Sequence, residues 1–188
     1  MEAAATPKNH GMFRMRFDVA GPFKIERFGP KKIITKESMK LLKPVLEQEE
    51  DGLSESCGCY VFGKRAGNGI TPWYIGQACK TPMLKEALNS SNITNYNHIL
   101  NGASGTPVLF VIPARTPTGK LRSRPSKSLK SLSFLERWLI AEAIEKNPEL
   151  FNTKETMMLR SLQVRGIFNA KQGESTAASK ELSKALGL

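Results

Sequence analysis

Residues 58–78, GCYVFGKRAGNGITPWYIGQA, contain two short apolar runs separated by a polar, glycine-rich connection. The runs CYVF and PWYIG are rich in the aromatic and β-branched residues that favour strands. The Asn-Gly pair at 68–69 lies between them and is a strong hairpin signal. We therefore predict two paired antiparallel strands, on which the rings of Tyr60 and Tyr74 can share one face.

Three further segments extend this hairpin into a mixed domain. TPMLKEALN, residues 81–89, opens with Thr-Pro followed by good helix formers and predicts a helix. TPVLFVIPA, residues 106–114, is an apolar, β-rich run that predicts a buried strand. The apolar spacing from about Ser131 to Lys146 predicts a long amphipathic helix. The order of elements favours an α/β fold of the mixed α+β kind with an antiparallel sheet.

We divide the chain into a central domain, residues 56–153, and two extensions. In the N-terminal extension, residues 1–55, alternating apolar residues predict short strands, and Thr35 or Ser38 can cap a short helix. The C-terminal extension, residues 154–188, is predicted to hold a strand and a helix. No internal repeat relates these parts to one another.

The charge of the chain is strongly positive, with 28 Lys and Arg against 17 Asp and Glu and a net charge of +11. Such a surplus suggests a polyanionic partner, most often nucleic acid. A basic loop at 113–131 suits contacts with a phosphate backbone, although a solvated loop without a partner has the same composition. The candidate contacts are Lys80 and, in the loop, Arg115, Lys120, Arg122, Arg124, Lys127 and Lys130.

The three cysteines, Cys57, Cys59 and Cys79, are too few and odd in number for a disulfide scaffold, which favours a reducing compartment. They could be imagined as zinc ligands together with His98, but C-x-C differs from the usual C-x₂₋₄-C spacing. No run approaches the roughly 18 apolar residues of a membrane span. We expect a cytoplasmic protein without a membrane partner.

The half-motifs GCY at 58–60 and YIG at 74–76 resemble those of the GIY-YIG endonucleases. Cys59 replaces the usual isoleucine at a position that should face away from the tyrosine side of its strand. The resemblance continues in a helix after YIG, in a later helix that carries Glu136, and in PELFN at 148–152. It covers about residues 56–153.

This resemblance implies a small three-stranded antiparallel sheet flanked by helices, and a metal-dependent endonuclease that hydrolyses phosphodiester bonds in DNA. Glu136 would bind Mg²⁺ or Mn²⁺, which prefer oxygen ligands. Tyr60 would help activate water, although a phenol with a pKa near 10 is a poor base unless a cation lowers that pKa. Tyr74 would position the phosphate or support Tyr60, and Asn152 would hold the geometry of the site.

One element departs from the family pattern. The helix after YIG normally supplies an arginine, whereas TPMLKEALN contains none. Lys85 is the best substitute, but lysine is a point charge without the guanidinium fork. His98 could compensate, because some restriction-type members use a histidine after this helix. The alternative is a catalytically weakened nucleic-acid-binding module on the same fold.

Each of these residues also has a structural explanation without chemistry. Tyr60 and Tyr74 could be ordinary strand aromatics, and Glu136 a solvated helix position beside Arg137. His98 could be a surface residue, and Asn152 a turn or cap. A third hypothesis for the whole chain is a small α/β adaptor whose charge serves solubility.

Overall fold

The computed structural model describes residues 15–101, 104–122, 124, 129–152, 156–157, 161–168 and 175–187. At its centre lies the predicted hairpin, in which β3 (Gly58–Ala66) pairs antiparallel with β4 (Gly69–Ala78). Gly67, with φ 56°, begins the two-residue loop between the strands, and glycine adopts positive φ without steric cost. The hairpin prediction is confirmed.

The sheet is larger than the three strands that we expected. β5 (Thr106–Arg115) pairs with β3 on one side. On its other side it pairs with two short strands of the N-terminal extension, β1 (Arg16–Phe17) and β2 (Ala20–Lys24). The strand order is β1-β5-β3-β4, with β2 also on β5, and all pairs are antiparallel. The extension thus provides hydrogen-bond partners for an edge of β5 that would otherwise stay unpaired.

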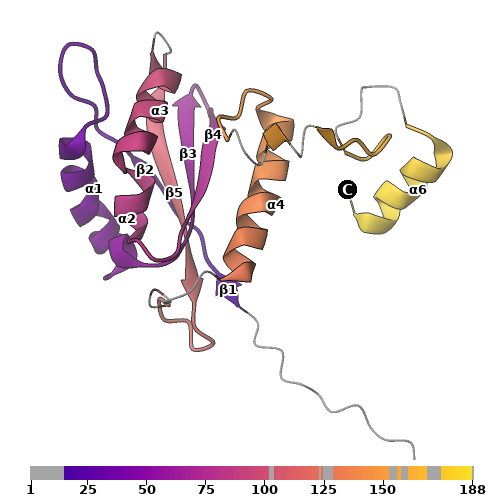
Figure 1. Ribbon diagram of the computed structural model, residues 1–188, viewed down its shortest axis with the longest axis horizontal. Helices are drawn as coiled ribbons and strands as arrows, with labels where there is room; N and C mark the ends of the chain where they lie inside the picture. Colours follow the sequence, from indigo (N-terminus) through magenta and orange to yellow (C-terminus); the bar gives the residue numbers. More distant parts are fainter. Residues whose placement is uncertain are drawn as a thin grey trace, which may run out of the picture.

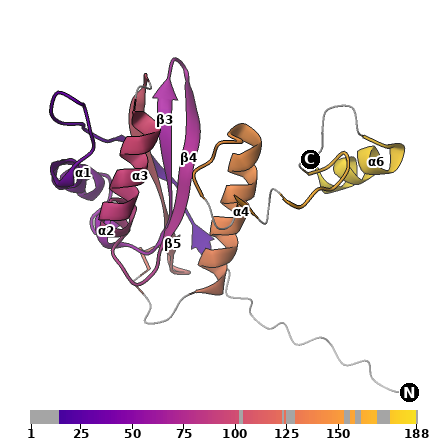
Figure 2. The ribbon, with the colours of Figure 1, turned by 45° about the horizontal axis from the view of Figure 1, so that its top comes forward.

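Helices cover both faces of this sheet (Figures 1 and 2). α1 (Lys36–Glu49), α2 (Met83–Ala87) and α3 (Ser90–Leu100) lie on one face, and α4 (Lys130–Lys146) lies on the other. The mixed α+β class is therefore confirmed. Among the described residues, no helix is both long and apolar enough to cross a membrane.

Two of the described helices, α1 and α6, begin at reciprocal side-chain caps. The Thr35 hydroxyl accepts a hydrogen bond from the Glu37 amide at 3.2 Å, and the Thr35 amide donates to Ser38 Oγ at 2.9 Å. Such reciprocal bonds satisfy the amides that a helix start leaves unpaired. In the C-terminal extension, α6 (Ala177–Leu186) begins with the same arrangement at Thr176.

Alternation along β3 creates two separate apolar layers. Tyr60 and Phe62 point toward α1–α3 and belong to the larger cluster. Cys59 and Val61 point toward α4, where they pack with residues such as Leu132. The expectation that Cys59 faces away from Tyr60 is confirmed, because successive strand residues alternate between faces.

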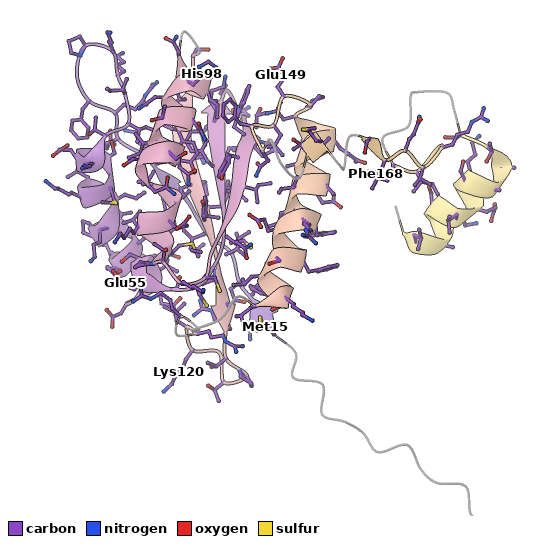
Figure 3. The ribbon with its side chains drawn as sticks, in the orientation of Figure 1. Met15, Glu55, His98, Lys120, Glu149 and Phe168 are labelled. Atoms are coloured by element: carbon purple, nitrogen blue, oxygen red, sulfur yellow. The ribbon has the colours of Figure 1, made fainter. Side chains whose placement is uncertain are left out.

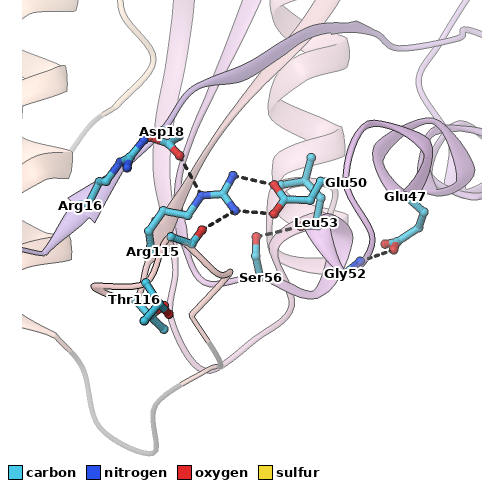
Figure 4. A network of polar contacts seen from close by, with 11 residues as sticks. Arg16, Asp18, Glu47, Glu50, Gly52, Leu53, Ser56, Arg115 and Thr116 are labelled. Atoms are coloured by element: carbon cyan, nitrogen blue, oxygen red, sulfur yellow. Dashed lines mark hydrogen bonds and ion pairs between the residues drawn. The ribbon is translucent and has the colours of Figure 1, made fainter.

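Arg115, at the end of β5, ties the N-terminal extension to the sheet (Figure 4). Its Nη1 and Nη2 both donate to the Glu50 carboxylate, with Nη2 2.6 Å from Oε2, and its Nε donates to Asp18 Oδ2 at 3.0 Å. The Arg115 side chain is only 11% exposed. Its guanidinium fork is therefore engaged by two carboxylates, an arrangement that favours strong hydrogen bonds.

Candidate functional site

The strand register places the two motif tyrosines on one face. Tyr60 is paired with Gly76 and Phe62 with Tyr74, so the two tyrosines are diagonal neighbours on the α1–α3 side. Their ring centroids lie 6.3 Å apart. The expectation that the rings can share a face is confirmed.

The two motif glycines allow close packing around Tyr60. A Cβ atom at Gly76 would overlap the ring and hydroxyl of Tyr60, and one at Gly58 would overlap the Ile112 carbonyl oxygen. Glycine is therefore required at both positions for steric reasons, because no larger side chain allows such an approach. The Tyr60 hydroxyl consequently lies directly over β4 at Gly76.

Tyr60 is buried, with 2% of its surface exposed. Asn92 Nδ2 donates to the Tyr60 hydroxyl at 2.9 Å and to the Glu86 carbonyl oxygen, also at 2.9 Å. Burial raises the pKa of Tyr60, and the nearby Tyr74, Glu86 and Glu136 raise it further, against the opposing hydrogen bond from Asn92. Tyr60 is therefore a neutral phenol at physiological pH.

Tyr74 is the more accessible tyrosine of the pair. It is half-buried, and its ring meets the ring of Tyr96 edge-on at 5.8 Å. Burial raises the pKa of Tyr74, as do the charges of Glu136 and Glu86, whereas a hydrogen bond with Tyr60 lowers it. A substrate at this face would meet the Tyr74 hydroxyl before that of Tyr60.

Glu136 lies on α4, in the layer opposite to the tyrosines. Gln77, which follows Gly76 and faces α4 beside Cys59, donates to Glu136 Oε2 at 2.9 Å. The negative charge of Glu136 is nevertheless close enough to raise the pKa values of both Tyr60 and Tyr74. Through Gln77, the residue after Gly76, Glu136 is thus joined to the strand that carries Tyr74.

Asn152 forms hydrogen bonds with the outer edge of β4. Its Oδ1 accepts from the Ile75 amide at 2.9 Å and its Nδ2 donates to the Ile75 carbonyl at 2.6 Å, as a neighbouring strand would. The Phe151 amide also donates to the Trp73 carbonyl at 2.9 Å. These bonds fix the strand that carries Tyr74 and Gly76.

The helix after YIG turns a carboxylate, and not a cation, toward the tyrosines. Lys85 is exposed, whereas the charge of its neighbour Glu86 raises the pKa values of Tyr60 and Tyr74. The motif gave no signal for Glu86 or Asn92. The periodicity of α2 gives a signal for Glu86, because Met83 and Ala87 are buried and position 86 borders the face they form.

His98 has a ring contact with Phe151. It is exposed near the end of α3, and its ring centroid is 5.8 Å from that of Phe151. Figure 3 shows it at the opposite end of the molecule from Lys120. It lines a surface hollow together with Lys31 and Lys32, a group that the sequence did not indicate.

The basic residues of loop 113–131 differ in their availability. Arg115 is held by Glu50 and Asp18, which argues against a phosphate contact, and Arg124 lies 3.8 Å from Glu55. Arg122 is half-buried, and Lys127 lies outside the described residues. Of the candidate phosphate contacts, the lysines Lys80, Lys120 and Lys130 are exposed.

The described residues contain no group of three or more His, Cys, Asp or Glu side chains arranged to hold a metal ion. The cysteines therefore form no such cluster with His98, which stands on the other face of the sheet from Cys59. Glu136 could hold a hard cation only if water and phosphate supplied most of the remaining ligands, an arrangement that suits Mg²⁺.

No protein family matches this sequence, and no curated protein and no solved structure shows a significant match to the chain. Its function must therefore be inferred from its own residues.

Proposed function

We propose that the chain is a metal-dependent endonuclease of the GIY-YIG kind, which hydrolyses phosphodiester bonds in DNA with Mg²⁺ or Mn²⁺ at Glu136. The observation that supports this proposal most strongly is the placement of the motif residues around Gly76. Tyr60 and Tyr74 share one face of the hairpin with ring centroids 6.3 Å apart, and Gln77, the residue after Gly76, donates to Glu136 at 2.9 Å. Asn152 holds the same strand by two hydrogen bonds. The net charge of +11 suits a polyanionic substrate.

In this proposal Tyr74 donates a hydrogen bond to the phosphate, because its hydroxyl is the more accessible one. Tyr60, buried and bonded to Asn92, orients Tyr74 and keeps its own proton. Because burial raises both pKa values, the two phenols are hydrogen-bond donors at neutral pH before a cation binds. When bound, the cation would polarise the phosphate and make an attacking water more acidic. The cysteines form no disulfide, which suits a cytoplasmic location.

A cleavage assay tests this proposal. Plasmid and single-stranded DNA are incubated with Mg²⁺ or Mn²⁺ and wild-type protein, Glu136→Gln or Glu142→Gln. Glu142 is an exposed carboxylate on the same helix and serves as the matched control. We expect Glu136→Gln to lose at least about a hundredfold in rate, as removal of a single stabilising group from an active site does, and Glu142→Gln to cut normally. Equal cutting by all three proteins would remove Glu136 from the mechanism.

A second function is favoured by a specific observation, namely that Glu86 faces the tyrosines while Lys85 is exposed. Phosphoryl chemistry requires positive charge over the phosphate. Without it, the domain would be a catalytically weakened nucleic-acid-binding module. This alternative predicts salt-dependent binding that needs neither Glu136 nor metal, and it predicts that Lys85→Arg stays as inactive as wild type. A gain of cutting in Lys85→Arg would count against it.

A further inference from the structure

A surface hollow lies between the turn at residues 28–33 and the last turn of α3. It is distant from the basic loop, since His98 in its wall and Lys120 in the loop lie at opposite ends of the molecule (Figure 3). Of the described residues that line the hollow, none is acidic. The lining residues are Lys31, Lys32, Ile33, Asn97, His98, Leu100 and Asn101.

Hydrogen bonds hold both walls of the hollow in place. In the turn, the Phe28 amide donates to the Ile33 carbonyl at 2.8 Å and the Ile33 amide donates back at 3.0 Å. Asn97 then joins the turn to α3, because its Oδ1 accepts from the Ile34 amide at 2.7 Å and its Nδ2 donates to the Ile34 carbonyl at 2.9 Å. The hollow is therefore a preorganised feature, which reduces the entropy lost on binding.

The polar groups of the hollow suit an anion. Two ammonium groups, the His98 imidazole and the Asn101 amide can donate hydrogen bonds, whereas the Asn97 amide is already engaged by Ile34. Other lysines of the chain are paired, such as Lys40 with Glu37 and Lys43 with Glu55. Among the described residues, no carboxylate forms an ion pair with Lys31 or Lys32. Their charges remain available to a phosphate group.

We propose that this hollow binds a backbone phosphate of the nucleic acid on which the chain acts, at a distance from the reacting bond. The identity of the ligand as nucleic acid rests on the proposed function. Position supports it, because the His98 ring in the wall lies against Phe151, whose neighbour Asn152 holds the edge of β4. A strand passing Gly76 and Tyr74 that continues along this edge reaches the hollow.

A purely structural explanation for the two lysines must be separated from this proposal. The hollow includes the C-terminal turn of α3, where the helix dipole favours positive charge. If the lysines only stabilise that helix end, their removal lowers thermal stability and leaves nucleic-acid binding intact. Binding and stability must therefore be measured on the same variants.

The experiment measures fluorescence anisotropy of a labelled DNA duplex with excess EDTA, so that binding is separated from cleavage. Wild type is compared over a range of salt concentrations with Lys31→Ala/Lys32→Ala and with Lys40→Ala/Lys43→Ala. The control pair removes the same charge from two lysines that already have carboxylate partners. We expect the first variant to bind about tenfold more weakly at low salt, and its slope of log affinity against log salt to fall by about 1.8, as for two lost phosphate contacts. The control should stay within about twofold of wild type.

Three outcomes would overturn the inference. One is equal affinity and slope for the two double variants, and another is a lowered melting temperature of Lys31→Ala/Lys32→Ala with unchanged binding. The third is displacement of the duplex by a mononucleotide at the same phosphate concentration, which would assign the hollow to a small ligand. Failure of the proposed function would give a different result. Glu136→Gln would then cut DNA as well as wild type, while Lys31→Ala/Lys32→Ala would still bind the duplex more weakly.

Discussion

Asn152 and Asn97 make the same pair of hydrogen bonds in two different regions of the molecule. Each side-chain amide accepts from the amide, and donates to the carbonyl, of one isoleucine, Ile75 for Asn152 and Ile34 for Asn97. The donor–acceptor distances lie between 2.6 and 2.9 Å in both regions. The difference is solvent access, since Asn152 is 9% exposed and Asn97 is only half-buried.

The same bonds therefore stabilise the two regions to different degrees. A buried backbone group that loses its partner keeps the full cost of desolvation, whereas a half-buried group can bind water in its place. Asn152 therefore determines whether the edge of β4 stays formed, and Asn97 mainly determines how firmly the turn at 28–33 is held. The two regions touch, because His98 and Phe151, the neighbours of the two asparagines, lie in contact.

The largest effect is expected for Asn152→Ala. It leaves the Ile75 amide and carbonyl without partners inside the protein, so we expect the free energy of unfolding to fall by about 3 kcal/mol. Urea unfolding of variant and wild type measures this loss. Asn152→Asp keeps the acceptor for the Ile75 amide, but at neutral pH it places a buried carboxylate oxygen against the Ile75 carbonyl oxygen, so it should lose at least as much as the alanine variant. A loss below about 1 kcal/mol for Asn152→Ala would show that the buried bonds of Asn152 stabilise the protein no more than exposed hydrogen bonds do.

A third asparagine, Asn92, binds the Tyr60 hydroxyl as well as a backbone carbonyl, and the titration of Tyr60 gives the next effect. Burial raises the pKa of Tyr60, so above about pH 10 the unfolded chain loses a phenol proton that the folded chain keeps. Tyr60 contributes its full share to the free energy of unfolding below about pH 10. Above that pH, this share falls by up to about 1.4 kcal/mol per pH unit.

Unfolding in urea at neutral pH and at two alkaline pH values tests this prediction, with Tyr60→Phe compared against wild type. The phenylalanine variant should lose stability less steeply above about pH 10, because one of the three tyrosines no longer titrates. The same slope in both proteins would show that the Tyr60 hydroxyl ionises in the folded state as readily as in the unfolded one.

Local patterns predicted the hairpin, the mixed class and the long helix, because each depends on neighbouring residues. The turn at Gly67 and the apolar spacing of α4 are of this kind. The pairing of β1 and β2 with β5 was not predictable, since it joins residues 84 to 99 positions apart and no local rule selects the partner strand. The sheet was therefore underestimated at three strands.

The candidate site shows the same division between local and distant information. The motifs placed Tyr60 and Tyr74 on one face of the hairpin, as the register shows, whereas the bonds from Asn152 to the Ile75 backbone came only from the structure. The motif suggested Lys85 as the cation beside the tyrosines. The orientation of α2, which the sequence motif does not specify, brings Glu86 toward them instead. The role of Asn97 was not predictable for a similar reason, since its partner Ile34 is 63 residues away in the sequence.

The smallest effect is expected for Asn97→Ala. Because water can reach Ile34 at this half-buried position, we expect a loss of about 1 kcal/mol or less in the free energy of unfolding. The double variant Asn97→Ala/Asn152→Ala then measures the contact between the two regions. If His98 and Phe151 transmit no strain, the losses should add within about 0.5 kcal/mol. A larger deviation would mean that the turn beside the hollow and the edge of β4 form one mechanical unit, so that an Asn97 variant would also disturb the strand that carries Tyr74.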